Sequence, residues 1–262
     1  MTIQDGDKNP VDSDVERART LNYSTVATLP RDQQLLLEKL NEIEGLVASD
    51  LAPTVKRTKL VDLYREADAL LARALDPENP DGIIANRERP YPWLASVLRA
   101  FVWASKGDFL KAAREEENAL QFALDNRMVD LAAMNYSNIS DALRRAASGA
   151  GGDSRRVELL QRAVAFAKAA LALPRGKTDP AIMIISALAL HAIGEPSMKA
   201  VSDDLLRGVA DLITSHPQDV TAAHGMYEAE LAYLAMDSPG AALLIERARA
   251  SRPEEGKPDE RA

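Results

Sequence analysis

The sequence predicts an all-α protein, an array of antiparallel helical hairpins with about ten helices. Aromatic residues make up only 5% of the 262 residues, while alanine, leucine, glutamate, arginine and lysine recur throughout, as is typical of helices. Prolines and glycines divide the chain into segments whose apolar residues are spaced three and four apart. Apolar residues make up 46% of the chain, which is enough to bury a sizeable interior. We therefore expect little or no sheet.

The first two helices are expected as a hairpin within residues 29–76, after a polar segment at 1–28 that we expect to be disordered. Pro30 and Pro53 stand in the first turns of these helices, where a missing N–H group costs nothing. The apolar residues of the second helix form one stripe and require a partner helix; they are Leu60, Leu63, Tyr64, Ala67, Leu70, Leu71 and Ala74.

A proline-rich connection is expected at 77–92, followed by a helical repeat domain at 93–250 and a polar tail at 251–262. The turns inside the repeat domain are short, so neighbouring helices should pack antiparallel. Its helices are expected at 93–105, 108–125, 128–147, 154–173, 180–193, 197–215, 219–236 and 239–250.

The stretch KGDFLKA, residues 106–112, has the pattern of a corner between two helices. Gly107 is expected to end one helix in a left-handed conformation, and Asp108 to cap the next. Ala112 and Ala119 supply small side chains where two helices approach closely. With Trp103 at the aromatic position of the first helix, this corner resembles the tetratricopeptide repeat, a helix-turn-helix unit of 34 residues.

This resemblance implies a right-handed, TPR-like solenoid over 93–250. Such arrays bind a peptide or protein segment along a concave surface that the first helix of each pair builds. Some peptide-binding members hold a ligand carboxylate or backbone with an asparagine in the first helix and basic residues nearby. The resemblance therefore implies a non-enzymatic adaptor or scaffold.

The helix at 128–147 carries the candidate peptide-binding residues. Amide and guanidinium groups pair with peptide backbone and carboxylate in fixed geometry, which suits them to such a surface. The alternative is that these residues are simply the solvated face of a helix. On either interpretation, replacing the asparagine and the second arginine together by alanine should leave the fold intact. The five candidates are Asn138, which resembles the family's asparagine, and Asp141, Arg145, Ser137 and Arg144.

The sequence gives no support for a catalytic, cofactor or metal site. The RGKT stretch at 175–178 resembles the end of a phosphate-binding loop, but Leu171 stands where that motif requires its first glycine. The three histidines do not form a Glu-x-x-His or His-Glu-x-x-His motif, and no Gly-x-Ser-x-Gly motif is present. We therefore expect no enzyme, no cofactor and no metal.

The charge of the chain bears on its partners and its compartment. A net charge of -8 and a pI near 5.1 disfavour binding to nucleic acid or to anionic lipid. The longest apolar stretch, at 181–194, is too short to cross a bilayer, so no membrane span is expected. The chain has no cysteine and shows no secretory signal in its first 30 residues, which favours the cytoplasm.

Two other classes of function stay open. The helix at 180–193 is apolar on nearly every side and must be covered, so it predicts either burial in the array or a homodimer contact in a structural subunit of a larger assembly. The other class is a ligand-binding sensor or enzyme with a closed helical pocket near His191, His224 and Tyr227.

Overall fold

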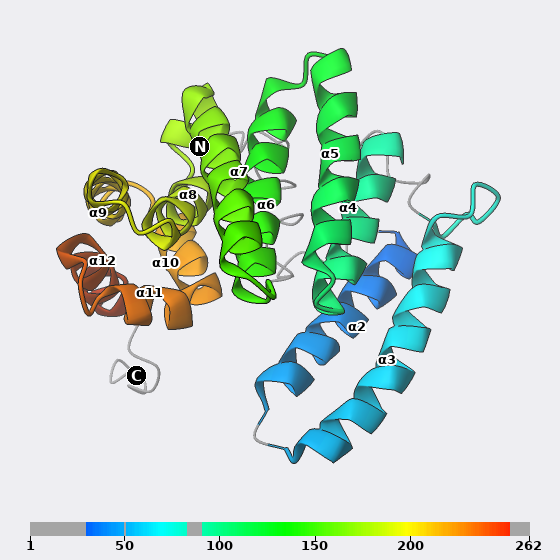
Figure 1. The fold of residues 1–262 in the computed structure, drawn as a ribbon. Coiled ribbons are helices and arrows are strands. Elements are labelled where there is room, and N and C mark those ends of the chain that lie inside the picture. Colours follow the sequence, from blue (N-terminus) through cyan, green and yellow to red (C-terminus); the bar gives the residue numbers. More distant parts are fainter. Residues whose placement is uncertain (1–29, 50, 83–90, 252–262) are drawn as a thin grey trace, which may run out of the picture. The chain divides into compact units, whose positions relative to one another are not determined.

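The computed structural model describes residues 30–49, 51–82 and 91–251 (Figure 1), and every regular element in these ranges is helical. The all-α prediction is therefore confirmed for the described part of the chain, which holds eleven α-helices where about ten were expected. The predicted tail at 1–28, the predicted tail at 251–262 except for its first residue, and half of the predicted connection at 77–92 (residues 83–90) lie outside these ranges. The chain divides into two compact units, residues 1–135 and 136–262, and the division falls inside helix α6.

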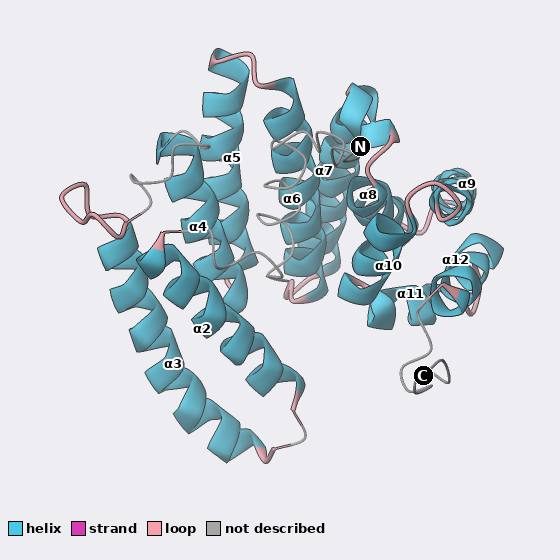
Figure 2. Ribbon diagram, turned by 180° about the vertical axis from the view of Figure 1, so that it is seen from behind, coloured by secondary structure: helices cyan, strands magenta, loops and turns pink. Residues whose placement is uncertain are grey.

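Unit 1 contains two helical hairpins and the beginning of α6. In the first hairpin α2 packs against α3, in the second α4 packs against α5, and both α2 and α3 also contact α4. Figure 2 shows short loops joining the paired helices. The bounds are α2 (Arg31–Ala48), α3 (Pro53–Ala74), α4 (Tyr91–Ser105), α5 (Phe109–Asp125) and α6 (Val129–Ser148).

A buried carboxylate fastens the open end of the α2–α3 hairpin. Asp32 is fully buried, and its carboxylate accepts hydrogen bonds from Arg73 Nη2 at 2.5 Å and from Asn79 Nδ2 at 2.6 Å. The backbone N–H of Asp32 donates to the carbonyl of Asp81 at 3.0 Å. Because the carboxylate is satisfied by charged and amide donors, its burial is tolerated and fixes the register of the two helices.

The corner between α4 and α5 has the predicted geometry. Gly107 has a φ of +75°, and the Asp108 side chain accepts a hydrogen bond from the backbone N–H of Lys111 at 3.2 Å. Both local predictions are confirmed. Trp103 also lies under two cations, with the Nζ atoms of Lys106 and Lys111 at 5.1 and 4.2 Å from its ring centre.

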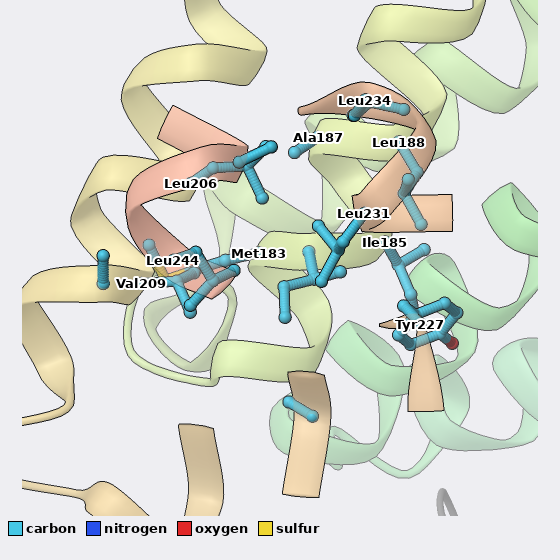
Figure 3. Packing of buried hydrophobic residues seen from close by; sticks show 14 of the residues in the cluster. Met183, Ile185, Ala187, Leu188, Leu206, Val209, Tyr227, Leu231, Leu234 and Leu244 are labelled. Atoms are coloured by element: carbon cyan, nitrogen blue, oxygen red, sulfur yellow. The ribbon is translucent and has the colours of Figure 1, made fainter. Parts of the chain in front are cut away.

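Unit 2 is built around the apolar helix α8. Every residue from Pro180 to Leu190 is buried, and α7 (Asp153–Ala172), α9 (Pro196–Leu212) and α10 (Pro217–Met226) all contact this helix. Figure 3 shows the cluster of buried side chains around it, including Met183, Leu206 and Leu231. Helices of its own unit therefore cover α8, so its apolar surface does not require a second subunit.

The elements of unit 2 that follow α6 are joined by short turns. They are α7 (Asp153–Ala172), the 3₁₀ turn η3 (Pro174–Lys177), α8 (Pro180–Ala192), α9 (Pro196–Leu212), α10 (Pro217–Met226), α11 (Glu228–Leu234) and α12 (Pro239–Ala250).

One predicted helix, at 219–236, is two helices in the structure. The backbone of Tyr227 has φ −121° and ψ 22°, outside the helical region, and it separates α10 from α11. Tyr227 is itself buried in the core cluster of unit 2. The spacing of apolar residues continues across the break between α10 and α11, which is why periodicity alone predicted one helix.

The corner glycine gives the first prediction. Gly107→Val should lower the free energy of unfolding by about 1 kcal/mol or more, because a β-branched residue is strained at positive φ. Urea unfolding followed by circular dichroism measures this change.

A matched control lies at the next turn, where Arg127 is an exposed non-glycine residue with a φ of +56°. Arg127→Gly should preserve or raise stability, since glycine removes that strain. An unchanged unfolding midpoint for Gly107→Val would contradict the strained conformation assigned to the corner.

Candidate functional site

The five residues predicted to bind a peptide all lie on α6 within unit 2, but they do not share one open surface. Ser137 is fully buried, so the prediction that it lies on the solvated side is wrong. Ser140, one turn further on, donates from Oγ to the carbonyl of Ala163 in α7 at 2.8 Å. Small hydroxyl side chains suit a close helix contact as well as a wet surface, and here they serve the contact.

Three of the other candidates form a compact cluster of charges with a residue of α11. The Asp141 carboxylate accepts hydrogen bonds from Arg144 Nη2 at 2.6 Å and from Arg145 Nε at 2.8 Å. Glu230 Oε1 lies 3.5 Å from Arg145 Nη2 and 3.8 Å from Arg144 Nη2. Two cations and two anions thus balance one another, and they tie α6 to α11.

The pKa shifts of Asp141 and Arg145 show that the charged groups of this cluster interact mainly with one another. Burial on its own would raise the pKa of Asp141, but the two neighbouring guanidinium groups outweigh it and hold that pKa below its ordinary value. The Asp141 carboxylate, in turn, is the main cause of a raised pKa for Arg145, against the effect of burial. Both groups therefore stay charged at neutral pH.

The α6 candidates are consequently poor ligand clamps. Asp141 and Arg144 have side chains only 15% and 13% exposed, and their charges are already neutralised by partners in the fold. Asn138 is half-buried on the same helix. A peptide carboxylate would have to displace the carboxylates that the guanidinium groups already hold, so the cluster is better described as a fastening between helices.

The residues considered for a closed pocket are also accounted for by packing. His191 Nε2 lies 3.4 Å from Asp237 Oδ1, and burial is the main cause of its lowered pKa. His224 is fully buried in α10, and Tyr227 is buried beside the break. In the described ranges no group of three or more acidic or histidine side chains could hold a metal ion.

A hollow surface that the sequence did not single out lies in unit 1, on the N-terminal half of α3. It is a groove of about 470 Å³, which we call the α3 groove, and its walls are mostly apolar. Val61 is 51% exposed there, and Leu51 is 42% exposed. The lining residues are Leu51, Pro53, Lys56, Arg57, Leu60, Val61 and Tyr64.

The groove exists because α2 covers only one side of α3. Of the 22 residues of α3, only Leu63, Ala67 and Ala74 are buried. Leu60 and Tyr64 are one turn apart and follow the neighbouring stripe of the helix. No helix of the described ranges is laid along this second stripe in the N-terminal half of α3, so its apolar side chains line an open surface.

The C-terminal end of the groove is held to α4. The Tyr64 hydroxyl donates to the carbonyl of Ser105 at 3.1 Å, and burial raises the pKa of this phenol. One turn further along α3, Asp68 pairs with Lys106 at 2.5 Å. These two contacts anchor α3 and leave the segment before Tyr64 projecting from the anchored part.

The rim of the groove is basic. Among the residues that the structure describes, the lining residues Lys56 and Arg57 form no ion pair, and Lys56 Nζ instead donates to the backbone carbonyl of Val47 at 3.1 Å. No acidic residue lies in the first turn of α3. The positive end of the helix dipole adds to these two cations, an arrangement that is unfavourable in the absence of an anionic partner.

Three other basic residues of the same hairpin are paired. Arg65 lies 3.2 Å from Asp62, Lys39 lies 2.7 Å from Glu66, and Arg73 is bound to Asp32 as described above. The two cations of the groove therefore differ from these three in having no described counter-charge. The sequence did contain a signal for the basic rim: three basic residues within seven positions at a helix N-terminus, where acidic residues are normally preferred.

No protein-family model, curated protein or solved structure matches this chain. In the described ranges, no helix combines the length and apolar character needed to cross a membrane.

The charge cluster on α6 gives a second prediction. Asp141→Asn should reduce the free energy of unfolding at pH 7 by roughly 2 kcal/mol, because two partly buried guanidinium groups lose their main counter-charge. The exposed Asp204→Asn is the matched control and should change it by less than about 0.5 kcal/mol.

The pH dependence follows from the lowered pKa of Asp141. Its contribution is fully present above the ordinary aspartate pKa and is lost as the pH falls through the lowered folded value. The difference between the wild type and Asp141→Asn should therefore shrink below about pH 4. A difference that stays constant from pH 7 to pH 3 in urea unfolding would show that the cluster is not the cause.

Proposed function

We propose that the chain is a non-enzymatic protein-binding module and that the α3 groove is its docking surface. The observation that carries this proposal is an open apolar hollow whose basic rim has no counter-charges in the described structure. Apolar side chains such as Val61 gain roughly 25 cal/mol for each Å² of surface removed from water. A partner that covers the groove would supply that gain.

The tetratricopeptide-like corner at Gly107 supports the same class of function, since arrays of this kind act by binding protein segments. We assign the binding surface, however, to α3 and not to α6, where the sequence predicted it. Asp141, Arg144 and Arg145 are committed to one another and to Glu230, whereas Lys56 and Arg57 of the groove form no ion pair among the described residues.

A cytoplasmic location forms part of the proposal. The chain contains no cysteine, which suits a reducing compartment without requiring one. The net charge of -8 supports a protein partner over nucleic acid for the molecule as a whole.

The third prediction tests the docking surface. Val61→Glu places a carboxylate in the apolar wall, and it should remove partners that the wild-type protein captures from a lysate of its native cells. Because Val61 is half exposed, the melting temperature should change little.

Val157→Glu in α7 is the matched control, because Val157 is 48% exposed and lies in unit 2, outside the groove. It should capture the same partners as the wild type, as measured by quantitative mass spectrometry. If both variants retain every partner, the α3 groove is not the docking surface.

A further inference from the structure

We propose that the α3 groove binds an acidic amphipathic helix of a partner protein, with leucine or phenylalanine side chains inserted between Leu51 and Tyr64. This inference rests on the proposed function and specifies the chemistry of the partner. Three properties of the groove support it: the hydrogen bonding of its backbone, the composition of its floor and the charge of its rim.

The backbone of the groove favours a helical occupant over an extended one. The groove wall is the side of α3, whose backbone N–H and C=O groups are hydrogen-bonded within the helix. An extended peptide would find no sheet edge to pair with, so its own backbone groups would lose water without replacement. A helix satisfies its backbone internally and presents only side chains, which is what this surface can accept.

The floor sets the apolar side of the occupant. Leu60, Val61 and Tyr64 line the groove with the spacing of one helix face, and Leu51 closes the end at the α2–α3 turn. From Pro53 to Tyr64 the wall is roughly 17 Å long at 1.5 Å per residue, which matches about three turns of a facing helix. Such a partner would present apolar residues at positions i, i+3 or i+4, and i+7.

The rim sets the charge of the occupant. Lys56 and Arg57 stand in the first two turns of α3, where the helix dipole adds to their positive charge. Glutamate or aspartate flanking the apolar stripe of the partner would neutralise these groups. An apolar floor does not suit a nucleic acid backbone, whose phosphates require polar contacts along their whole length. An acidic protein helix satisfies both the floor and the rim.

Two synthetic helical peptides test the proposal with the full-length protein. Both carry leucine at i, i+3, i+4 and i+7; one has glutamate at the flanking positions, and the other has lysine there. Fluorescence anisotropy should show the acidic peptide binding at least tenfold more tightly than the basic one. Added salt should reduce this preference, because the rim charges are exposed.

Two charge reversals in the rim and one substitution in the apolar wall test whether the peptide binds in the α3 groove. Lys56→Glu together with Arg57→Glu should abolish the preference for the acidic peptide or reverse it, and Val61→Glu should weaken acidic-peptide binding at least tenfold. Arg156→Glu reverses an exposed charge on α7 and is the matched control, which should leave the affinity for both peptides unchanged. Equal affinity of the wild type for the two peptides would overturn the proposed charge selection.

The remaining outcomes separate the inference from the proposed function and from other occupants. If neither peptide binds but Val61→Glu still loses its lysate partners, the acidic-helix inference is wrong and the proposed function stands. If neither peptide binds and no lysate partner is lost, both fail. Sedimentation showing a dimer that Val61→Glu dissociates would identify a second copy as the occupant and overturn the inference.

Two further results would also overturn it. Peptide binding that appears only after Asp12→Asn, Asp14→Asn and Glu16→Gln would identify the chain's own N-terminal segment as the occupant. Binding to phosphatidylserine vesicles that is lost in Arg57→Glu, without any binding of the acidic peptide, would identify an anionic lipid surface instead.

Discussion

The uneven cover of α3 is the constraint on which the functional account depends. α2 buries one stripe of this helix at Leu63 and Ala67, while Tyr64 and Asp68 fasten it to the end of α4. The fastening lies past the middle of the helix, so the N-terminal half is held at a fixed position while no described helix covers the stripe that α2 leaves open. An apolar surface held in this way can remain accessible without unfolding, because helix propensity and the hairpin contacts stabilise α3 independently of any partner.

In unit 2, by contrast, the most apolar helix is enclosed on all sides. α8 is so apolar that it must be enclosed, and helices of the same unit enclose it (Figure 3). The polar groups of this unit then act as fastenings between helices, as in the pairing of Asp141 with two arginines or the capping of α12 by Asp203. The Asp203 carboxylate accepts hydrogen bonds from Ser238 Oγ at 2.8 Å and from the Gly240 N–H at 2.6 Å. Polar residues that are already hydrogen-bonded or ion-paired to one another in the fold are poor candidates for binding a ligand.

The fold class, the corner at Gly107 and the burial of α8 could be predicted from the sequence, because each depends on local chemistry or on the spacing of apolar residues. Asn135, on α6, is fully buried and bonded to Trp93 and Glu116 in unit 1. The solvated side assigned to α6 was not reliable, because periodicity does not show whether Ser137 meets water or another helix. The α3 groove was missed since its existence depends on which side of α3 its partner helix leaves uncovered, and that is a tertiary property.

Thiol labelling at the groove tests the central claim most directly, because the chain has no cysteine of its own. Val61→Cys should react with a maleimide at nearly the rate of an exposed thiol, and the acidic helical peptide should slow this reaction at least tenfold. Val157→Cys should react at a similar rate with and without the peptide. Slow labelling at position 61 in the free protein, or a rate that the peptide leaves unchanged, would contradict an open groove that binds an acidic helix.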